Sequence, residues 1–235
     1  PTITSYRKLG QEQFELAIPK PDTGFKPGKY TLQIEVETKD RDAIVAAEYD
    51  FTWGVLAINV NKSIYLPGET AYIQMGAVDN FGYTVCNAKM ELTISHAESG
   101  KGAKLSTDDG TIHYSDQCRG DTFTSKPDYF GYVTLPSDTG VYEMELTAFS
   151  RNGTHTIKDQ FEVWPSVPFD VERFGPTRIY PPATYEVKFR ITANEDFQGK
   201  AIETVPGSFG ISSLDDQSQS KFQTSSNGNT QQITW

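Results

Sequence analysis

The sequence predicts an all-β protein made of tandem β-sandwich domains, and three observations favour this fold class. Residues 61–73 have the pattern of a strand, a tight turn and a second strand. A strand ending that opens with Gly-x-Tyr occurs twice, at residues 28–53 and 140–164. The chain also contains 12 Tyr, 14 Phe and 3 Trp, which favour strands, and it shows no helical periodicity of useful length.

The first of these patterns centres on Pro67 and Gly68, which predict a type II turn. Proline presets φ at the second turn position, and glycine supplies the positive φ that the third position requires. After the turn, Ala71, Ile73 and Met75 recur with a period of two. We therefore expect a strand with one buried and one solvated face, in a building-block protein rather than an enzyme.

The repeated strand ending places a tyrosine two residues after a turn glycine, at Tyr30 and at Tyr142. In each copy an alternating strand, a polar turn and a final aromatic strand follow. Tyr30 and Tyr142 are candidates for the tyrosine corner of Greek-key sandwiches, in which the hydroxyl bonds the backbone. The alternative is an ordinary cross-strand aromatic at each position.

These endings divide the chain into three predicted domains. Residues 1–54 are the C-terminal part of one sandwich, residues 55–164 a complete sandwich, and residues 165–235 a third, truncated sandwich. A short Pro-stiffened linker at residues 164–168 separates the second domain from the third. We expect both ends to be cut from a longer multi-domain protein.

Charge and hydropathy exclude several classes of partner. The 235 residues carry 21 Lys and Arg against 31 Asp and Glu, a net charge of −10. No basic patch can neutralise phosphates, so we expect no nucleic-acid partner. No apolar run approaches the roughly 20 residues that span a bilayer, so we expect no direct membrane insertion.

The two cysteines, Cys86 and Cys118, predict one disulfide. An even pair in an acidic, β-rich chain is typical of proteins from an oxidising compartment, so we expect an extracellular or cell-surface location. Two buried thiols are the alternative. A zinc site that adds His96 and His113 is a remote option, because the close ligand spacing of structural zinc sites is missing.

Residues 55–164 resemble the macroglobulin-type domains of the alpha-2-macroglobulin superfamily and the related immunoglobulin-like repeats of large bacterial surface proteins. The matching runs are Asn-Lys-Ser-Ile-Tyr-Leu-Pro-Gly-Glu-Thr at 61–70, Gly-Tyr-Val-Thr-Leu-Pro at 131–136 and Gly-Val-Tyr at 140–142. The resemblance implies tandem immunoglobulin-like or macroglobulin-like sandwiches. The Cys-Gly-Glu-Gln thioester and the bait region by which macroglobulins trap proteases are not recognisable here.

Catalytic constellations are weak in this chain. His96, His113 and His155 are the only histidines, and we expect them in solvated loops without a Gly-x-Ser-x-Gly elbow. Glu143 and Glu145 alternate with apolar neighbours, so a glycosidase pair is less favoured than the solvated face of a strand. We therefore predict no enzymatic activity and no cofactor.

Two further possibilities concern bound ions and covalent cross-links. The aspartate-rich spots at residues 79–80, 108–110 and 215–216 lack the spacing of a calcium loop, although calcium between domains stays open. An isopeptide bond needs a buried lysine, a carboxyl or amide partner and a nearby acid. Lys89 and Lys188 lie in strand-like runs, but alternation points both toward solvent.

We therefore expect a non-enzymatic cell-surface protein that serves as a stalk, scaffold or adhesin segment. Its partners would be its own neighbouring domains and an unidentified protein or carbohydrate ligand. One alternative is an internal fragment of a macroglobulin-like protease trap. Another is an accessory carbohydrate-binding domain of a secreted enzyme, which would need a row of exposed aromatics; residues 129–132 cluster, but their pattern suggests edge and core packing.

Overall fold

The computed structural model describes residues 6–10, 13–18, 26–37, 44–119, 124–151, 153–178, 183–196, 198–213 and 222–235. The described residues form an all-β structure without a helix, as the sequence predicts. They fall into two compact units, one of Pro27–Phe197 and one of Pro1–Lys26 with Gln198–Trp235.

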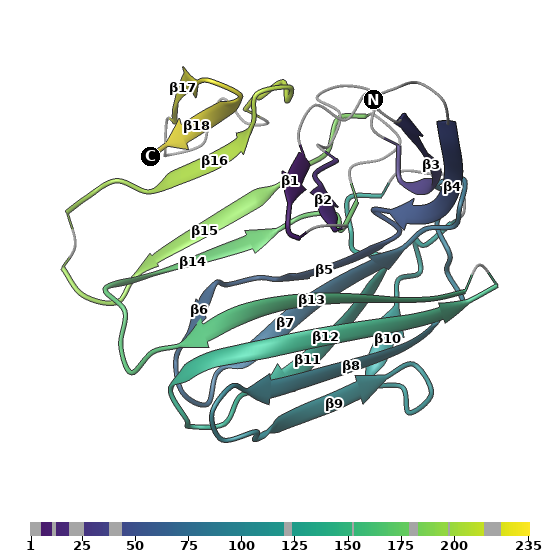
Figure 1. Ribbon diagram of the computed structural model, residues 1–235. Helices are drawn as coiled ribbons and strands as arrows, with labels where there is room; N and C mark the ends of the chain where they lie inside the picture. Colours follow the sequence, from purple (N-terminus) through teal and green to yellow (C-terminus); the bar gives the residue numbers. More distant parts are fainter. Residues whose placement is uncertain are drawn as a thin grey trace. The chain divides into compact units, whose positions relative to one another are not determined.

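The larger unit contains a two-layer β-sandwich (Figure 1). One sheet has the strand order β10-β11-β7-β5, and the other has the order β6-β13-β12-β8-β9. Neighbouring strands are antiparallel except β6 and β13, which pair in parallel. The strands are β5 (Leu56–Val60), β6 (Ile64–Tyr65), β7 (Thr70–Ala77), β8 (Lys89–His96), β9 (Gly102–Ser106), β10 (Ile112–Tyr114), β11 (Tyr129–Thr134), β12 (Gly140–Ser150) and β13 (Gly153–Val163).

Period-two alternation builds the core between the two sheets. In β12 the side chains of Tyr142, Met144 and Leu146 are at most 1% exposed, whereas the residues between them face outward. The antiparallel register sets Met144 opposite Ile94 and Leu146 opposite Leu92 in β8. Each such buried side chain contributes about 1.5–3 kcal/mol of apolar burial, which makes this alternation the main support of the sandwich.

Three aromatic rings close one end of the core. Phe161 of β13 stacks on Tyr142 with ring centroids 5.3 Å apart and meets Tyr65 edge-on at 5.2 Å. The Tyr142 hydroxyl donates to the carbonyl oxygen of Asp138 at 3.0 Å, which is the kind of backbone bond a tyrosine corner makes. The ring of Tyr30, the other candidate, packs against Phe51 and Trp53 within a separate hairpin.

That hairpin consists of β3 (Gly28–Glu37) and β4 (Ile44–Trp53) and abuts the sandwich through its first residues. The Lys29 amide donates to the carbonyl oxygen of Asn80 at 3.0 Å. Gly28 has a φ of 148°, and a Cβ at this position would lie 2.5 Å from the same carbonyl oxygen. The close approach therefore requires glycine.

Strands β14 (Phe169–Phe174) and β15 (Lys188–Ala193) complete the larger unit as an antiparallel pair. The smaller unit contains the hairpin β1 (Tyr6–Lys8) and β2 (Phe14–Leu16), and a sheet of β16 (Ile202–Pro206), β18 (Thr230–Thr234) and β17 (Gln223–Asn227). The domains 1–54, 55–164 and 165–235 stay a prediction. Within the larger unit, the Lys29–Asn80 and Arg173–Asn61 backbone hydrogen bonds join elements on either side of the two predicted boundaries.

Replacing Tyr142 with Phe should lower the free energy of unfolding by about 1 kcal/mol, because it removes one buried hydrogen bond and leaves the ring stack intact. Chemical denaturation followed by tryptophan fluorescence measures the change. The matched control is Tyr132→Phe, since Tyr132 is 57% exposed and should shift stability by less than about 0.5 kcal/mol. An equal effect of the two variants would contradict a structural role for the Tyr142 hydroxyl.

Candidate functional site

The most constrained polar region of the larger unit is the contact between the sandwich and strand β14, which we call the joint. The chain leaves β13 at Val163 and enters β14 at Phe169, so five residues connect the two. The Trp164 amide donates to the Tyr65 carbonyl oxygen at 2.9 Å, and the Arg173 amide donates to the Asn61 carbonyl oxygen at 2.8 Å. The first residue of the linker is thus fixed to the sandwich, and so is strand β14, which follows the linker.

Asn61 lies at the centre of the joint and is only 6% exposed. Its side-chain oxygen accepts hydrogen bonds from the Tyr65 hydroxyl at 2.7 Å and from the Tyr72 amide at 3.1 Å. Its side-chain nitrogen donates to Glu172 of β14 at 3.1 Å. One amide group therefore links the sandwich core, strand β7 and strand β14.

Lys62 lies beside Asn61 and faces two carboxylates. Its Nζ atom is 2.9 Å from Glu69 Oε1 and 3.4 Å from Asp170 Oδ1. The side chains of Lys62 and Asp170 are 11% and 12% exposed. Burial lowers the pKa of Lys62, but the hydrogen bond and charge of Glu69 and the charge of Asp170 outweigh it, so the pKa lies above its ordinary value.

The Pro-Gly turn positions one of these carboxylates. Gly68 has a φ of 78°, the value that the third position of a type II turn requires. The Glu69 amide closes the turn on the Leu66 carbonyl oxygen at 3.2 Å, and Glu69 Oε2 accepts from the Leu66 amide at 2.8 Å. The turn thereby fixes Glu69 with its second oxygen toward Lys62.

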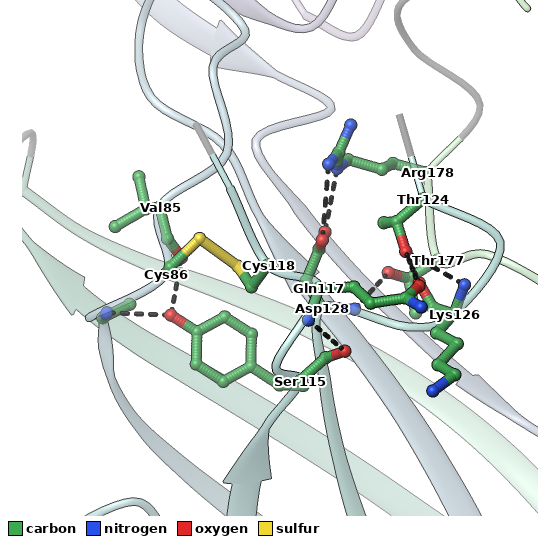
Figure 2. The surroundings of a disulfide bond; sticks show 12 residues. Val85, Cys86, Ser115, Gln117, Cys118, Thr124, Lys126, Asp128, Thr177 and Arg178 are labelled. Carbon is green, nitrogen blue, oxygen red and sulfur yellow. Dashed lines mark hydrogen bonds and ion pairs between the residues drawn. A yellow bond between two sulfur atoms is a disulfide. The ribbon is translucent and has the colours of Figure 1, made fainter. Parts of the chain in front are cut away.

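A second, more deeply buried ion pair lies elsewhere in the joint. Figure 2 shows the Asp128 carboxylate directed at the Arg178 guanidinium, which donates from Nε to Oδ2 at 2.9 Å. The two side chains are 0% and 9% exposed. Burial raises the pKa of Asp128 above its ordinary value, and Arg178 offsets only part of this effect.

Small and hydroxyl residues surround this ion pair. The Asp128 amide donates to the Thr177 hydroxyl at 3.4 Å. A Cβ on Gly76 would lie 2.8 Å from that hydroxyl and 3.3 Å from Asp128 Oδ2. The absence of a side chain at Gly76 therefore gives the Asp128 carboxylate and Thr177 their space against β7.

A disulfide lies beside the backbone of Asp128. Cys86 and Cys118 are joined, as the sequence predicts, and the sulfur atoms lie beside the Asp128 loop in Figure 2. The Ser115 carbonyl oxygen accepts a hydrogen bond from the Cys118 amide at 3.0 Å, and the Ser115 amide donates to the Asp128 carbonyl oxygen at 2.8 Å. On the other side of the disulfide, the Tyr129 hydroxyl donates to the Val85 carbonyl oxygen and accepts the Ala88 amide. Burial raises the pKa of Tyr129 to about 12, so this hydroxyl keeps its proton at neutral pH.

Aromatic side chains gather on the outer face of β7 and β11, and we call this group the aromatic face. Tyr72 and Tyr132 stack with ring centroids 5.1 Å apart, and Phe130 lies 6.1 Å from Tyr72. His113 of β10 extends the row beside Phe130, and Phe174 of β14 extends it beside Tyr72. The prediction of edge and core packing for residues 129–132 was wrong for Phe130 and Tyr132, because only the alternate residues point into the core.

The structure also places the other candidates from the sequence. The histidines lie in strands and not in loops as expected: His96 is buried in β8 with Nε2 3.0 Å from the Thr139 carbonyl oxygen, His113 is in β10 and His155 is in β13. The disulfide consumes both cysteines of the zinc option. Glu143 and Glu145 are exposed, as alternation predicts.

The lysines considered for an isopeptide bond are exposed as well. Lys89 and Lys188 are 47% and 73% exposed and form surface ion pairs with Asp108 and Glu186. Aspartates 79 and 109 accept hydrogen bonds within their own turns. Residues 215–216 lie outside the described part of the chain, and among the described residues no group of three or more His, Cys, Asp or Glu could hold a metal ion.

Sequence reasoning missed most of the joint. Asn61 and Lys62 open the run that leads into the Pro-Gly turn, a position that could have drawn attention to them. Asp128, Thr177 and Arg178 carry no local pattern that marks them. Their pairing follows from the packing of β14 and the segment after it on the sandwich.

Comparison with known proteins finds no family model and no curated protein that matches this sequence. The resemblance to macroglobulin-type domains stays a prediction. In the part of the chain that the structure describes, no helix is long and apolar enough to cross a membrane.

Replacing Asp128 with Ala should lower the free energy of unfolding by about 3–5 kcal/mol, because the buried ion pair with Arg178 and its hydrogen bonds are lost. Urea denaturation measures the loss. The control is Glu145→Ala, which breaks the exposed Lys158–Glu145 pair and should cost about 1 kcal/mol or less. Losses of similar size in both variants would contradict the assignment of Asp128 to a buried, geometry-setting pair.

Proposed function

We propose that this protein is a non-enzymatic, extracellular or cell-surface chain of β-sandwich domains that acts as a scaffold or stalk. One observation carries the proposal, namely that the sandwich and the strand pair after it meet through a buried polar joint. A flexible tether would leave its polar groups in water and would allow many orientations. Here Asn61, Lys62 and Asp128 are held against β14 and the segment after it, which favours a single orientation.

The polar groups of the joint fix the orientation of β14 on the sandwich more than they add to the stability of this contact. Buried ion pairs add little net stability because desolvation offsets most of their attraction. Their geometry is nevertheless demanding, since a displaced partner leaves a charge or amide unpaired at a cost of about 1–3 kcal/mol for each neutral group. Asn61, Lys62 and Asp128 are three groups of this kind. Together they penalise a change of orientation at the joint, although they add little net stability to the contact.

The disulfide supports the location part of the proposal. Structural disulfides form and persist in oxidising compartments, so the Cys86–Cys118 bond indicates a non-cytoplasmic environment. The net charge of −10 suits a solvated exterior. An extracellular or cell-surface position is the form of this environment that best fits a scaffold.

Distance measurements between two spin labels test whether the joint holds one orientation. Cysteines replacing Lys158 in β13 and Lys188 in β15 carry the labels; both lysines are exposed, and the native cysteines are bonded to each other. Pulsed electron resonance should give a narrow distance distribution, as narrow as that of a control pair at Lys104 and Lys158 within one sheet. The same joint pair should broaden in Asp128→Ala, because the buried pair is lost.

A broad distribution for the joint pair in the unmodified background, beside a narrow one for the control pair, would overturn the scaffold proposal. A joint pair that stays narrow in Asp128→Ala would keep the fixed orientation but remove Asp128 from its cause.

A second candidate function, carbohydrate binding, is favoured by the aromatic face. The C–H groups of a pyranose ring pack well on the electron-rich face of an aromatic ring. Tyr132 is 57% exposed and stacks with Tyr72, so their rings offer a platform of this kind. The protease-trap alternative has no comparable feature among the described residues and stays a prediction.

Pull-down on insoluble cellulose, chitin and xylan tests the second candidate. Binding to one of them should fall at least tenfold in Tyr132→Ala, because the exposed ring is lost. Tyr114→Ala is the control, since Tyr114 is 70% exposed at the sheet edge and is not part of the aromatic face. Absence of binding to all three, or equal loss in both variants, would count against this candidate.

A further inference from the structure

The enclosed Lys62 differs from the other ion-paired lysines of the described chain. The lysines of the surface pairs, at positions 29, 89, 101, 158 and 188, have side chains 47–76% exposed, against 11% for Lys62. Two carboxylates face its Nζ atom, from Glu69 at 2.9 Å and from Asp170 at 3.4 Å. A primary amine, a carboxyl group and an additional acid thus meet in one partly desolvated place.

The Asp170 carboxyl group is held against Lys62. Its Oδ2 atom accepts a hydrogen bond from the Asn194 side chain at 3.1 Å. Its Oδ1 atom is buried and lies 3.4 Å from the Lys62 Nζ atom, an ion-pair contact that lacks the geometry of a hydrogen bond. The amine and the carboxyl group therefore face each other directly.

We propose that Lys62 and Asp170 condense to an intramolecular isopeptide bond, with Glu69 as the residue that transfers the proton. The bond would join the sandwich covalently to β14. This modification site goes beyond the scaffold role. The geometry that supports it is that of the Lys62, Asp170 and Glu69 side chains.

The reaction balances without an added reagent. The Lys62 ammonium gives a proton to Glu69, and the resulting amine attacks Cγ of Asp170. A C–N bond forms, a C–O bond breaks, and the departing oxygen leaves as water with protons delivered through Glu69. The net change is an ammonium and a carboxylate converted to an amide and one water, and Glu69 ends in its starting state.

The local environment supplies the orientation that this reaction needs. Contact between Nζ and the carboxyl group replaces a bimolecular encounter with an oriented one. Partial burial disfavours the charged form of Lys62, but the neighbouring carboxylates outweigh this effect and stabilise the ammonium. Because the two carboxylates keep the pKa of Lys62 raised, the proton transfer from Lys62 to Glu69 is the step expected to limit the rate.

Intact mass of the full chain under denaturing conditions, after reduction and alkylation of both cysteines, tests the proposal. The chain should be about 18 Da lighter than its sequence mass, the loss of one water. Proteolysis should release a branched peptide that contains both Lys62 and Asp170. The mass of unmodified sequence, or a deficit without this branched peptide, would overturn the proposal.

Matched variants assign the chemistry. Lys62→Arg keeps the positive charge and the ion pairs but cannot form the amide, so it should restore the sequence mass in a folded chain. Glu69→Gln should also restore it, because the proton carrier is lost. Lys101→Arg changes the exposed Lys101–Asp138 pair and should retain the deficit. A deficit that persists in Lys62→Arg would refute the assignment.

The scaffold proposal is tested separately by the spin-label distances. A chain of unshifted mass with a narrow distance distribution would refute the isopeptide bond and leave the scaffold in place. A mass lower by one water together with a broad distance distribution would support the isopeptide bond and overturn the scaffold proposal.

Discussion

The joint depends on one requirement, that the buried side chain of Asn61 pairs all of its polar groups. Its oxygen needs the Tyr65 hydroxyl and the Tyr72 amide, and its nitrogen needs Glu172. Tyr65 is a fully buried core residue whose ring meets Phe161. Because any displacement of β14 strips a partner from Asn61, the packing of the core and the position of β14 are coupled through a single amide.

The Asp128–Arg178 pair imposes the same kind of constraint from another side of the joint. The pair is too deeply buried to gain much net stability, so its effect is to penalise every arrangement that separates the charges. The disulfide adds to this by joining Cys86 to Cys118, beside the backbone bond between Ser115 and Asp128, and so it restricts the unfolded chain. The ion pair and the disulfide therefore both act on the region around Asp128, the first through charge and the second through a covalent bond.

The sequence predicts the sandwich far better than the joint, for a physical reason. Alternation at Met144 and Leu146 and the turn chemistry of Pro67 and Gly68 are local, so they can be read within a few residues. The pairing of Asn61 with Glu172 spans 111 residues, and that of Asp128 with Arg178 spans 50. Polar pairs at such separations depend on how finished elements pack, which no local period encodes.

The same limit explains two particular misjudgements of side-chain environment. The sequence suggested a solvated loop for His96, yet strand β8 extends to His96 and its ring packs edge-on against Tyr142. Alternation could exclude Lys89 and Lys188 as buried amines because both lie in strands. It gave no information on Lys62, which lies between β5 and β6 and is enclosed by β14.

The position of the Lys62–Asp170 contact has a mechanical consequence for a stalk. Tension between the chain before residue 62 and the chain after residue 170 would normally pass through β6, β13 and the linker. With an amide between these two side chains, the load crosses from the start of the sandwich to β14 through covalent bonds. Residues 63–169, which include the disulfide and most of the core, then lie outside the path of the force. A scaffold built in this way keeps most of its sandwich folded under load, because β5 is the one strand of the sandwich that the path of the force still includes.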